Sequence, residues 1–108
     1  MIPRGVEVFV GLDPIDLRWG FDRLVGVVHE RMARRARSGA LYVFFGRGRT
    51  SMKVFFADSN GLCIFYKRLD KGTFRLPQSF DDQKTLRIDE RVLDDLLEGI
   101  NIDLPTKH

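Results

Sequence analysis

The sequence has little of the material from which disulfides and metal sites are built. A single cysteine, Cys63, has no internal partner, which suits a reducing cytoplasm. It and two histidines, His29 and His108, are too few for a common zinc site. No stretch approaches the roughly 18 uninterrupted apolar residues of a membrane span, and residues 1–5 lack the apolar core of a secretion signal. We therefore expect a cytoplasmic protein without metal or other cofactor.

The chain does have enough apolar material for one folded domain. It has 108 residues, of which 44% are hydrophobic, including nine phenylalanines. Domains most often run to roughly 100–150 residues, so a single domain is expected. We place it at residues 1–102 and treat residues 103–108 as a tail.

Several segments have the composition of β-strands. They are rich in β-branched and aromatic residues and lie at residues 6–10, 41–45, 52–57 and 62–69, with a shorter one at 85–88, and residues 6–10 also alternate. The turn residues Asp58-Ser59-Asn60-Gly61 predict a tight hairpin, and a basic, glycine-rich loop precedes residue 52. The strands at 41–45, 52–57 and 62–69 are predicted to form an antiparallel meander.

Two helices are expected. Apolar residues at i, i+3, i+4, i+7 and i+11 from Phe21 predict an amphipathic helix that ends near Gly39. Asp13-Pro14 resembles the start of an earlier helical turn that Gly20 breaks or bends. Asp89 should cap a last helix at 90–97. The order of elements predicts the α+β class, with both helices on one face of an antiparallel sheet.

The charge of the chain changes sign along its length. Residues 1–75 carry 14 lysines and arginines against 7 acids, whereas residues 76–108 carry 4 against 8, which gives +7 and −4 and the net +3. Such asymmetry suggests a polyanion or an oppositely charged partner, although ordinary solubilising charge explains it equally well.

Nine basic residues are candidates for binding DNA. One lies in the irregular stretch before the first helix, three should share one face of that helix, three lie in the first hairpin loop and its exit, and two lie at the far end of the next strand. The last two groups should meet at one edge of the sheet. The candidates are Arg18, Arg31, Arg34, Arg35, Arg47, Arg49, Lys53, Lys67 and Arg68.

Aromatic and acidic residues suggest further contacts. Tyr42, Phe44, Phe55 and Phe65 could stack on bases, although a small domain needs them in its core. Trp19 is a candidate for partner contact or a plug between helix and sheet. On the last helix three outward acids could bind a partner or simply face solvent, namely Asp94, Asp95 and Glu98.

No catalytic residues are expected. Four aspartates could suggest a two-metal nuclease, but each has a structural explanation at a helix start or a turn, and they are Asp13, Asp16, Asp22 and Asp58. The loop at 46–53 lacks the Gly-Lys-Ser/Thr ending of a phosphate loop and joins two strands instead of opening a helix.

Several stretches resemble one known family. Residues 16–24, Asp-Leu-Arg-Trp-Gly-Phe-Asp-Arg-Leu, look like its Asp-Met-Arg-Lys-Gly-Phe-Asp-x-Leu motif. Further similarity lies in residues 39–44, 58–62, 67–74 and 96–100. The family is the small accessory protein, called TnpB or Orf2, of bacterial insertion sequences of family sixty-six, which is unrelated to the RNA-guided nuclease of the same name. Trp19 replaces the family's usual lysine, and Leu76 replaces a tryptophan before Pro77.

The resemblance implies a non-enzymatic protein that supports movement of a mobile element beside a separate DDE-type transposase. It carries over no catalytic residues. Three hypotheses follow, in decreasing order of preference. The protein binds DNA at the element ends through the basic sheet edge, it is an adaptor that contacts the transposase, or it is a metal-dependent nuclease.

Overall fold

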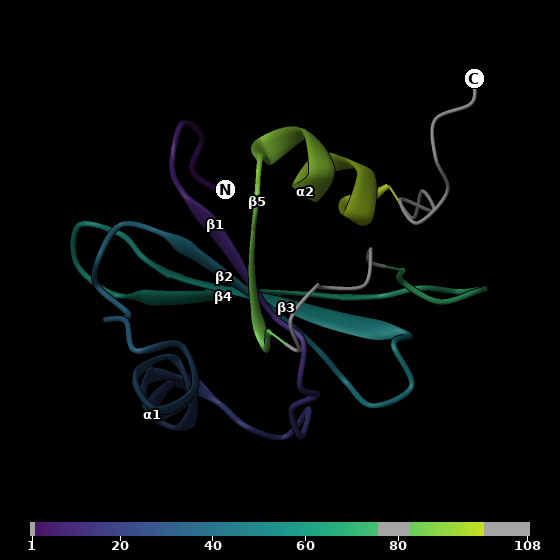
Figure 1. Cartoon of the computed structure of the whole chain (residues 1–108), viewed down its shortest axis with the longest axis horizontal. Coiled ribbons are helices and arrows are strands. Elements are labelled where there is room, and N and C mark those ends of the chain that lie inside the picture. Colours follow the sequence, from purple (N-terminus) through teal and green to yellow (C-terminus); the bar gives the residue numbers. More distant parts are fainter. Residues whose placement is uncertain (1, 76–82, 99–108) are drawn as a thin grey trace.

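The fold was analysed in a computed structural model of the chain, which describes residues 2–75 and 83–98 (Figure 1). Two helices and five strands follow one another along it. They are β1 (Val8–Gly11), α1 (Phe21–Met32), β2 (Leu41–Phe45), β3 (Ser51–Ala57), β4 (Leu62–Arg68), β5 (Thr85–Ile88) and α2 (Glu90–Leu97). The boundaries of β2, β5 and α2 agree with the prediction residue by residue.

The five strands form one sheet in the order β4-β3-β2-β1-β5. The predicted meander of β2, β3 and β4 is confirmed, because both of its strand pairs are antiparallel. β1 pairs with β2 in parallel, however, so the sheet is mixed and not antiparallel throughout. A parallel pair requires a long crossover, and residues 12–40, which include α1, provide it.

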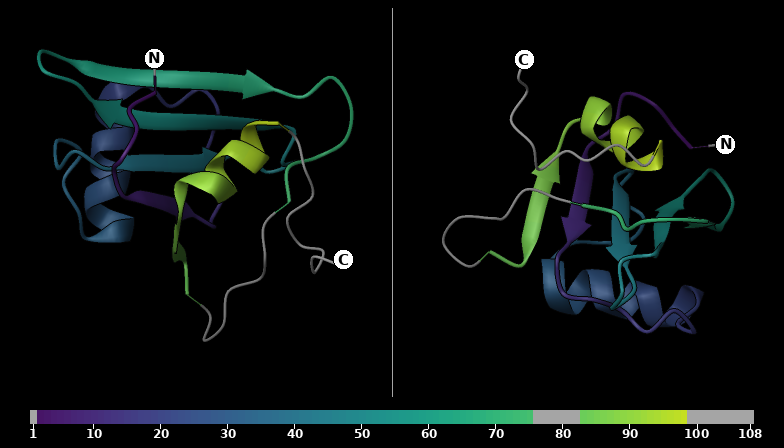
Figure 2. Two further views of the ribbon diagram at one scale, coloured as in Figure 1. Left: turned by 90° about the horizontal axis from the view of Figure 1, so that it is seen from above. Right: turned by 90° about the vertical axis from the view of Figure 1, so that its right-hand side faces the viewer.

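The two helices lie on opposite faces of the sheet (Figure 2). Leu24 and Val28 of α1 pack with Tyr42 and Phe44 on one face. On the other face, α2 contributes its buried leucines, which pack with the valine and phenylalanine side chains of β1, β2 and β3. The α+β class is therefore confirmed, but the expectation that both helices cover one face is wrong. The crossover fixes α1 on its face, and α2 follows β5 at the far side of β1.

Two predictions about helix ends are corrected by the structure. No helical turn follows Asp13-Pro14, because the backbone N–H of Ile15 donates to the carbonyl of Phe45 at 2.9 Å and ties this segment to β2. α1 ends at Met32 and not near Gly39, since Ala33 adopts the left-handed conformation (φ 55°).

The cap of α2 is as predicted, because the side chain of Asp89 accepts the backbone N–H of Val92 at 3.0 Å. The proposed domain boundary at residue 102 and the tail lie outside the described residues. No helix in the described part of the chain is long and apolar enough to cross a membrane.

Candidate nucleic-acid interface

The loop from residue 12 to residue 20 is held against the sheet by apolar contacts. Ile15 is buried in the core on the α1 face. Leu17 packs where Gly46 has no side chain, since a Cβ at Gly46 would lie 2.8 Å from a Leu17 methyl carbon. A turn follows, in which the N–H of Trp19 donates to the carbonyl of Asp16 at 2.9 Å. These contacts set the position of Trp19 at the entrance to α1.

Lys53 anchors the same loop from within the sheet. It lies in the middle of β3 with only 7% of its surface exposed. Its Nζ donates to the carbonyl oxygens of Leu17 at 2.6 Å and Trp19 at 2.9 Å. Because the ammonium group is committed to two carbonyls, the structure assigns Lys53 to holding the Trp19 loop.

Two arginines of α1 lie over the indole of Trp19. The guanidinium carbon of Arg23 is 4.5 Å from the ring centre, and that of Arg31 is 5.5 Å away. Arg31 also donates to the carbonyl oxygens of Asp13 and Pro14, both at 3.3 Å. Arg23 is absent from the sequence-based candidates, although its spacing of eight residues from Arg31 places both on one helix face.

A hollow of about 520 Å³ opens beside this stack. Trp19 and Arg31 line it together with Arg47, which comes from the β2–β3 loop. No ion pair joins Arg23, Arg31 or Arg47 to a carboxylate among residues 2–75 and 83–98. The hollow is therefore bordered by two arginines with no carboxylate partner in that part of the chain, and by Asp16, which is paired with Arg18.

Arg18 precedes Trp19 in the chain and is paired with Asp16. The Nη2–Oδ2 distance is 2.6 Å, and the side chain of Arg18 remains 89% exposed. The hydrogen bond from this guanidinium lowers the pKa of Asp16 to about 2, from an ordinary value of 3.8. The pair holds Arg18 in one orientation beside Trp19.

The remaining predicted basic residues do not join this group. Arg34 and Arg35 lie beyond the end of α1, so the predicted helix face shared with Arg31 does not form. Arg34 stacks on Phe9 at 3.9 Å and approaches Glu7 at 3.4 Å. The Nζ of Lys67 donates to the carbonyl of Leu97 on the α2 face.

The two basic strand ends do meet at one edge, as the antiparallel register predicts. Ser51 is opposite Arg68, and the N–H of Leu69 donates to the carbonyl of Thr50 at 2.8 Å. Arg49 sits in the loop with positive φ (57°), its guanidinium 5.9 Å from the ring of Phe45. The backbones of the two basic strand ends therefore meet at this edge. Their basic side chains do not form one group, because neighbouring residues of a strand face opposite sides of the sheet.

The preference for a core position of the four meander aromatics is confirmed for three of them and wrong for Phe65. Tyr42, Phe44 and Phe55 are fully buried in the core, whereas Phe65 is 39% exposed on β4. The hydroxyl of Tyr42 donates to the carbonyl of Arg35 at 3.0 Å and accepts from Arg34 at 3.2 Å. Three of the four rings are thus unavailable to bases.

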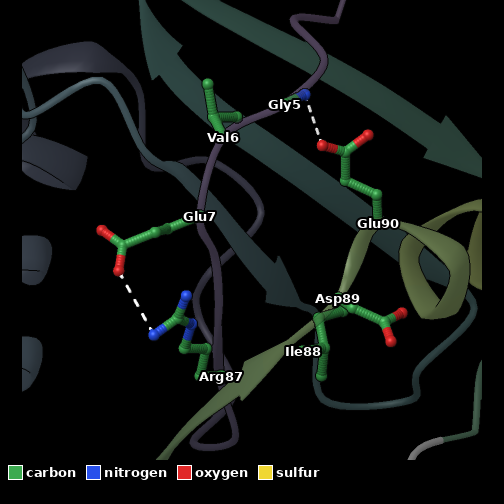
Figure 3. Close-up of a pocket in the computed structure, with 7 residues that line it drawn as sticks. All are labelled: Gly5, Val6, Glu7, Arg87, Ile88, Asp89 and Glu90. Atoms are coloured by element: carbon green, nitrogen blue, oxygen red, sulfur yellow. Dashed lines mark hydrogen bonds and ion pairs between the residues drawn. The ribbon is translucent and has the colours of Figure 1, made fainter.

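The acidic residues of α2 are partly used within the fold. Arg4 of the N-terminal segment donates to Asp94 at 2.9 Å, and this hydrogen bond lowers the pKa of the Asp94 carboxyl. The N–H of Gly5 donates to Glu90 at the edge of a second hollow (Figure 3). Asp95 is half-buried, and Glu98 is exposed at the end of the helix.

Each of the four aspartates considered for a nuclease has a structural role in an ion pair, a turn or the first turn of a helix. Asp13 pairs with Lys84 at 3.4 Å, Asp58 accepts the N–H of Asn60 in its turn at 3.1 Å, and Asp22 lies in the first turn of α1. Within the described ranges, no three His, Cys, Asp or Glu side chains gather closely enough to hold a metal ion.

Cys63 is half-buried on β4 and not in the core interior. Burial and the neighbouring Asp58, whose Oδ2 lies 3.5 Å from Sγ, raise the pKa of its thiol. The thiol is thus held in its protonated form and packs against the α2-face core.

Fold and surface together define a small α+β protein with a loop-borne tryptophan set among arginines. A family model described as "IS66 Orf2 like protein" matches residues 6–107. The chain belongs to this family, which supports an accessory role in transposition and agrees with the resemblance noted above.

Two relatives come from Sinorhizobium fredii (strain NBRC 101917 / NGR234). Uncharacterized protein y4hO is 36% identical over 103 residues, covering 94% of this chain and 88% of its own length. Uncharacterized protein y4jC is 27% identical over 74 residues, covering 68% and 63%. No solved structure matches the chain.

Proposed function

We propose that the protein binds DNA as an accessory of insertion-sequence transposition, through the surface around Trp19. This Trp19 surface consists of Arg18, Trp19, Arg23, Arg31 and Arg47. The observation that carries the proposal is the pair of guanidinium groups over one indole, beside a hollow that a third arginine lines. Membership of the family supports the setting in transposition.

The chemistry of the surface suits a phosphate backbone. A guanidinium offers a planar fork of donors that fits phosphate oxygens, and stacking on an indole limits its movement before the ligand arrives. The loop that carries Trp19 is fixed by Lys53, so the arginines are arranged around a rigid platform. Preorganised donors lose less side-chain entropy on binding.

A salt titration tests this proposal. Binding of fluorescent duplex DNA from the ends of the element should weaken as salt is added. The logarithm of the binding constant should fall with the logarithm of the salt concentration, with a slope of about 0.9 for each phosphate contacted. Arg23→Gln combined with Arg31→Gln should lower the affinity by about tenfold or more per arginine and reduce the slope.

Arg91→Gln is the matched control, because Arg91 is exposed on α2 at the other face of the sheet. Arg91→Gln should change the DNA affinity and the salt slope much less than the double variant of Arg23 and Arg31 does. Binding that does not depend on salt, or an equal loss in the control variant, would contradict the proposal.

The second candidate function is direct contact with the transposase through α2. Asp95 and Glu98 are the acidic residues of that helix for which no ion pair with a described residue is found, whereas Asp94 is paired with Arg4. Co-purification with the transposase that survives nuclease treatment, and that Asp95→Asn with Glu98→Gln abolishes, would favour this function over DNA binding.

A further inference from the structure

The large apolar side chains that the described fold leaves exposed gather around one strand. Phe65 (39% exposed) and Tyr66 (52%) belong to β4, and Phe21 (48%) and Val25 (37%) belong to α1. Val25 and Leu62 of β4 line the same hollow, so the exposed side of the helix adjoins the strand. The patch therefore follows β4 on both faces of the sheet.

β4 is also an edge strand with a regular backbone. Its register with β3 runs without a bulge from Leu62 to Arg68. The N–H of Leu69 donates to the carbonyl of Thr50, and the N–H of Asp58 donates to the carbonyl of Gly61, so every second residue pair between them is hydrogen-bonded. The N–H and C=O groups of Phe65 therefore point toward β3, whereas those of Ile64 and Tyr66 point outward from the edge.

Edge strands are usually protected by charge, proline or a bulge. The segment Cys63-Ile64-Phe65-Tyr66 has none of these, and the ammonium group of Lys67 is turned to the carbonyl of Leu97. The opposite edge of the sheet is different, because β5 has only four residues and carries the exposed Arg87. The unprotected edge of the described sheet is therefore β4.

We propose that β4 pairs with β4 of a second copy of this chain, antiparallel and about a two-fold axis at Phe65. This register places Phe65 opposite Phe65 and Ile64 opposite Tyr66, so the exposed apolar side chains face one another. Aromatic and β-branched cross-strand pairs of this kind stabilise antiparallel sheets. The result is a continuous ten-stranded sheet across the two copies.

Charge favours a second copy in this orientation and disfavours a neighbouring register. The carboxyl end of β4 is basic, whereas the turn before its amino end carries Asp58. A two-fold axis brings each basic end beside the other copy's Asp58 turn, with Lys71 opposite Ser59. A register shifted by two residues, with Ile64 opposite Ile64, would instead place Asp70 opposite Asp58, where like charges repel.

Cysteine cross-linking tests the register directly. Phe65→Cys in a Cys63→Ser background places two thiols at a non-hydrogen-bonded pair, where Cα atoms are about 4.5 Å apart and a disulfide forms without distortion. Mild oxidation should convert this variant to a covalent dimer. Ser59→Cys in the same background is the control, because in this register its two copies lie about 40 Å apart.

The mass in solution tests the pairing itself. Light scattering should give twice 12.5 kDa for the natural chain as concentration rises, and the monomer mass for Phe65→Lys with an unchanged circular dichroism spectrum. Thr85→Lys on β5 should leave the dimer intact. A monomer at every concentration, or equal cross-linking of Ser59→Cys and Phe65→Cys, would overturn the proposal, and in that case another extended chain becomes the candidate for this edge.

Discussion

Lys53 shows how a single cation can support a surface without being part of it. Its charge lies under the loop, where two carbonyl oxygens replace the water that the ammonium group loses on burial. Its stem fills part of the α1 face beside the ring of Tyr66, 5.3 Å from Nζ. The residue thus links the sheet to the position of Trp19.

Lys53→Met should therefore destabilise the protein although it replaces a charge by an apolar chain of similar length. Two loop carbonyls would lose their donor, at a cost of about 1–3 kcal/mol. Urea unfolding followed by Trp19 fluorescence measures the loss, and the native emission should shift as the indole moves. Lys71→Met, at an exposed position, should change the free energy of unfolding much less.

Asp16 provides a prediction about pH. Its pKa in the folded state is about 2, below the ordinary 3.8, because Arg18 hydrogen-bonds the carboxylate. A lowered folded-state pKa means that the pair contributes stability above about pH 4 and loses it as the pH falls through about 2. Carboxyl-carbon NMR should show this midpoint, and Arg18→Gln should move it toward 3.8, whereas Arg68→Gln should not.

At the scale of elements, hydrophobic period and turn residues were sufficient for most of the fold. The strands β2 and β5 and the helix α2 are bounded by Gly, Pro or Asp signals that act locally. The end of α1 was missed because Ala33 adopts a left-handed conformation that nothing in its side chain indicates. The parallel pairing of β1 was missed because it depends on contacts more than thirty residues apart.

The candidate site was predicted only in part, for a related reason. Sequence places Arg18, Arg31 and Arg47 among basic residues, but it does not show that the loop folds back to bring them to Trp19. Arg23 is not among the sequence-based candidates, because only the fold of this loop brings its guanidinium group over Trp19. The burial of Lys53 depends on the same loop, whose carbonyl oxygens at Leu17 and Trp19 accept its ammonium group.

Two glycines test the fold at this scale. Gly26→Ala should raise the free energy of unfolding by about 1 kcal/mol, because a Cβ there meets no atom within 4 Å and alanine favours the helix. Gly11→Ala should lower it by about 1–3 kcal/mol, since the new Cβ would lie 2.9 Å from the ring of Phe44. Equal effects of the two changes in urea unfolding would contradict the packing described.

At the scale of the whole molecule, one sheet serves two cores. The side chains of β2 and β3 alternate between the layer under α1 and the layer under α2. A substitution that destabilises one layer should therefore also destabilise the other, because both layers share these strands.

Leu96→Ala tests this coupling, because Leu96 of α2 is fully buried in the core on the face away from Trp19. The change should cost about 2–5 kcal/mol. Trp19 fluorescence and far-ultraviolet circular dichroism should still report one shared unfolding midpoint at lower urea. Two separate midpoints would show that the layers unfold independently.

The parallel pairing of β1 with β2 affects the order in which the elements assemble during folding. The meander closes through short loops, whereas β1 docks on β2 only after residues 12–40 have crossed the sheet, and such long closures are slow. Within the described sheet β5 pairs with β1 alone, so its pairing must wait for that step. Assembly should thus run outward from the meander, and α2, which follows β5 in the chain, should complete its face last.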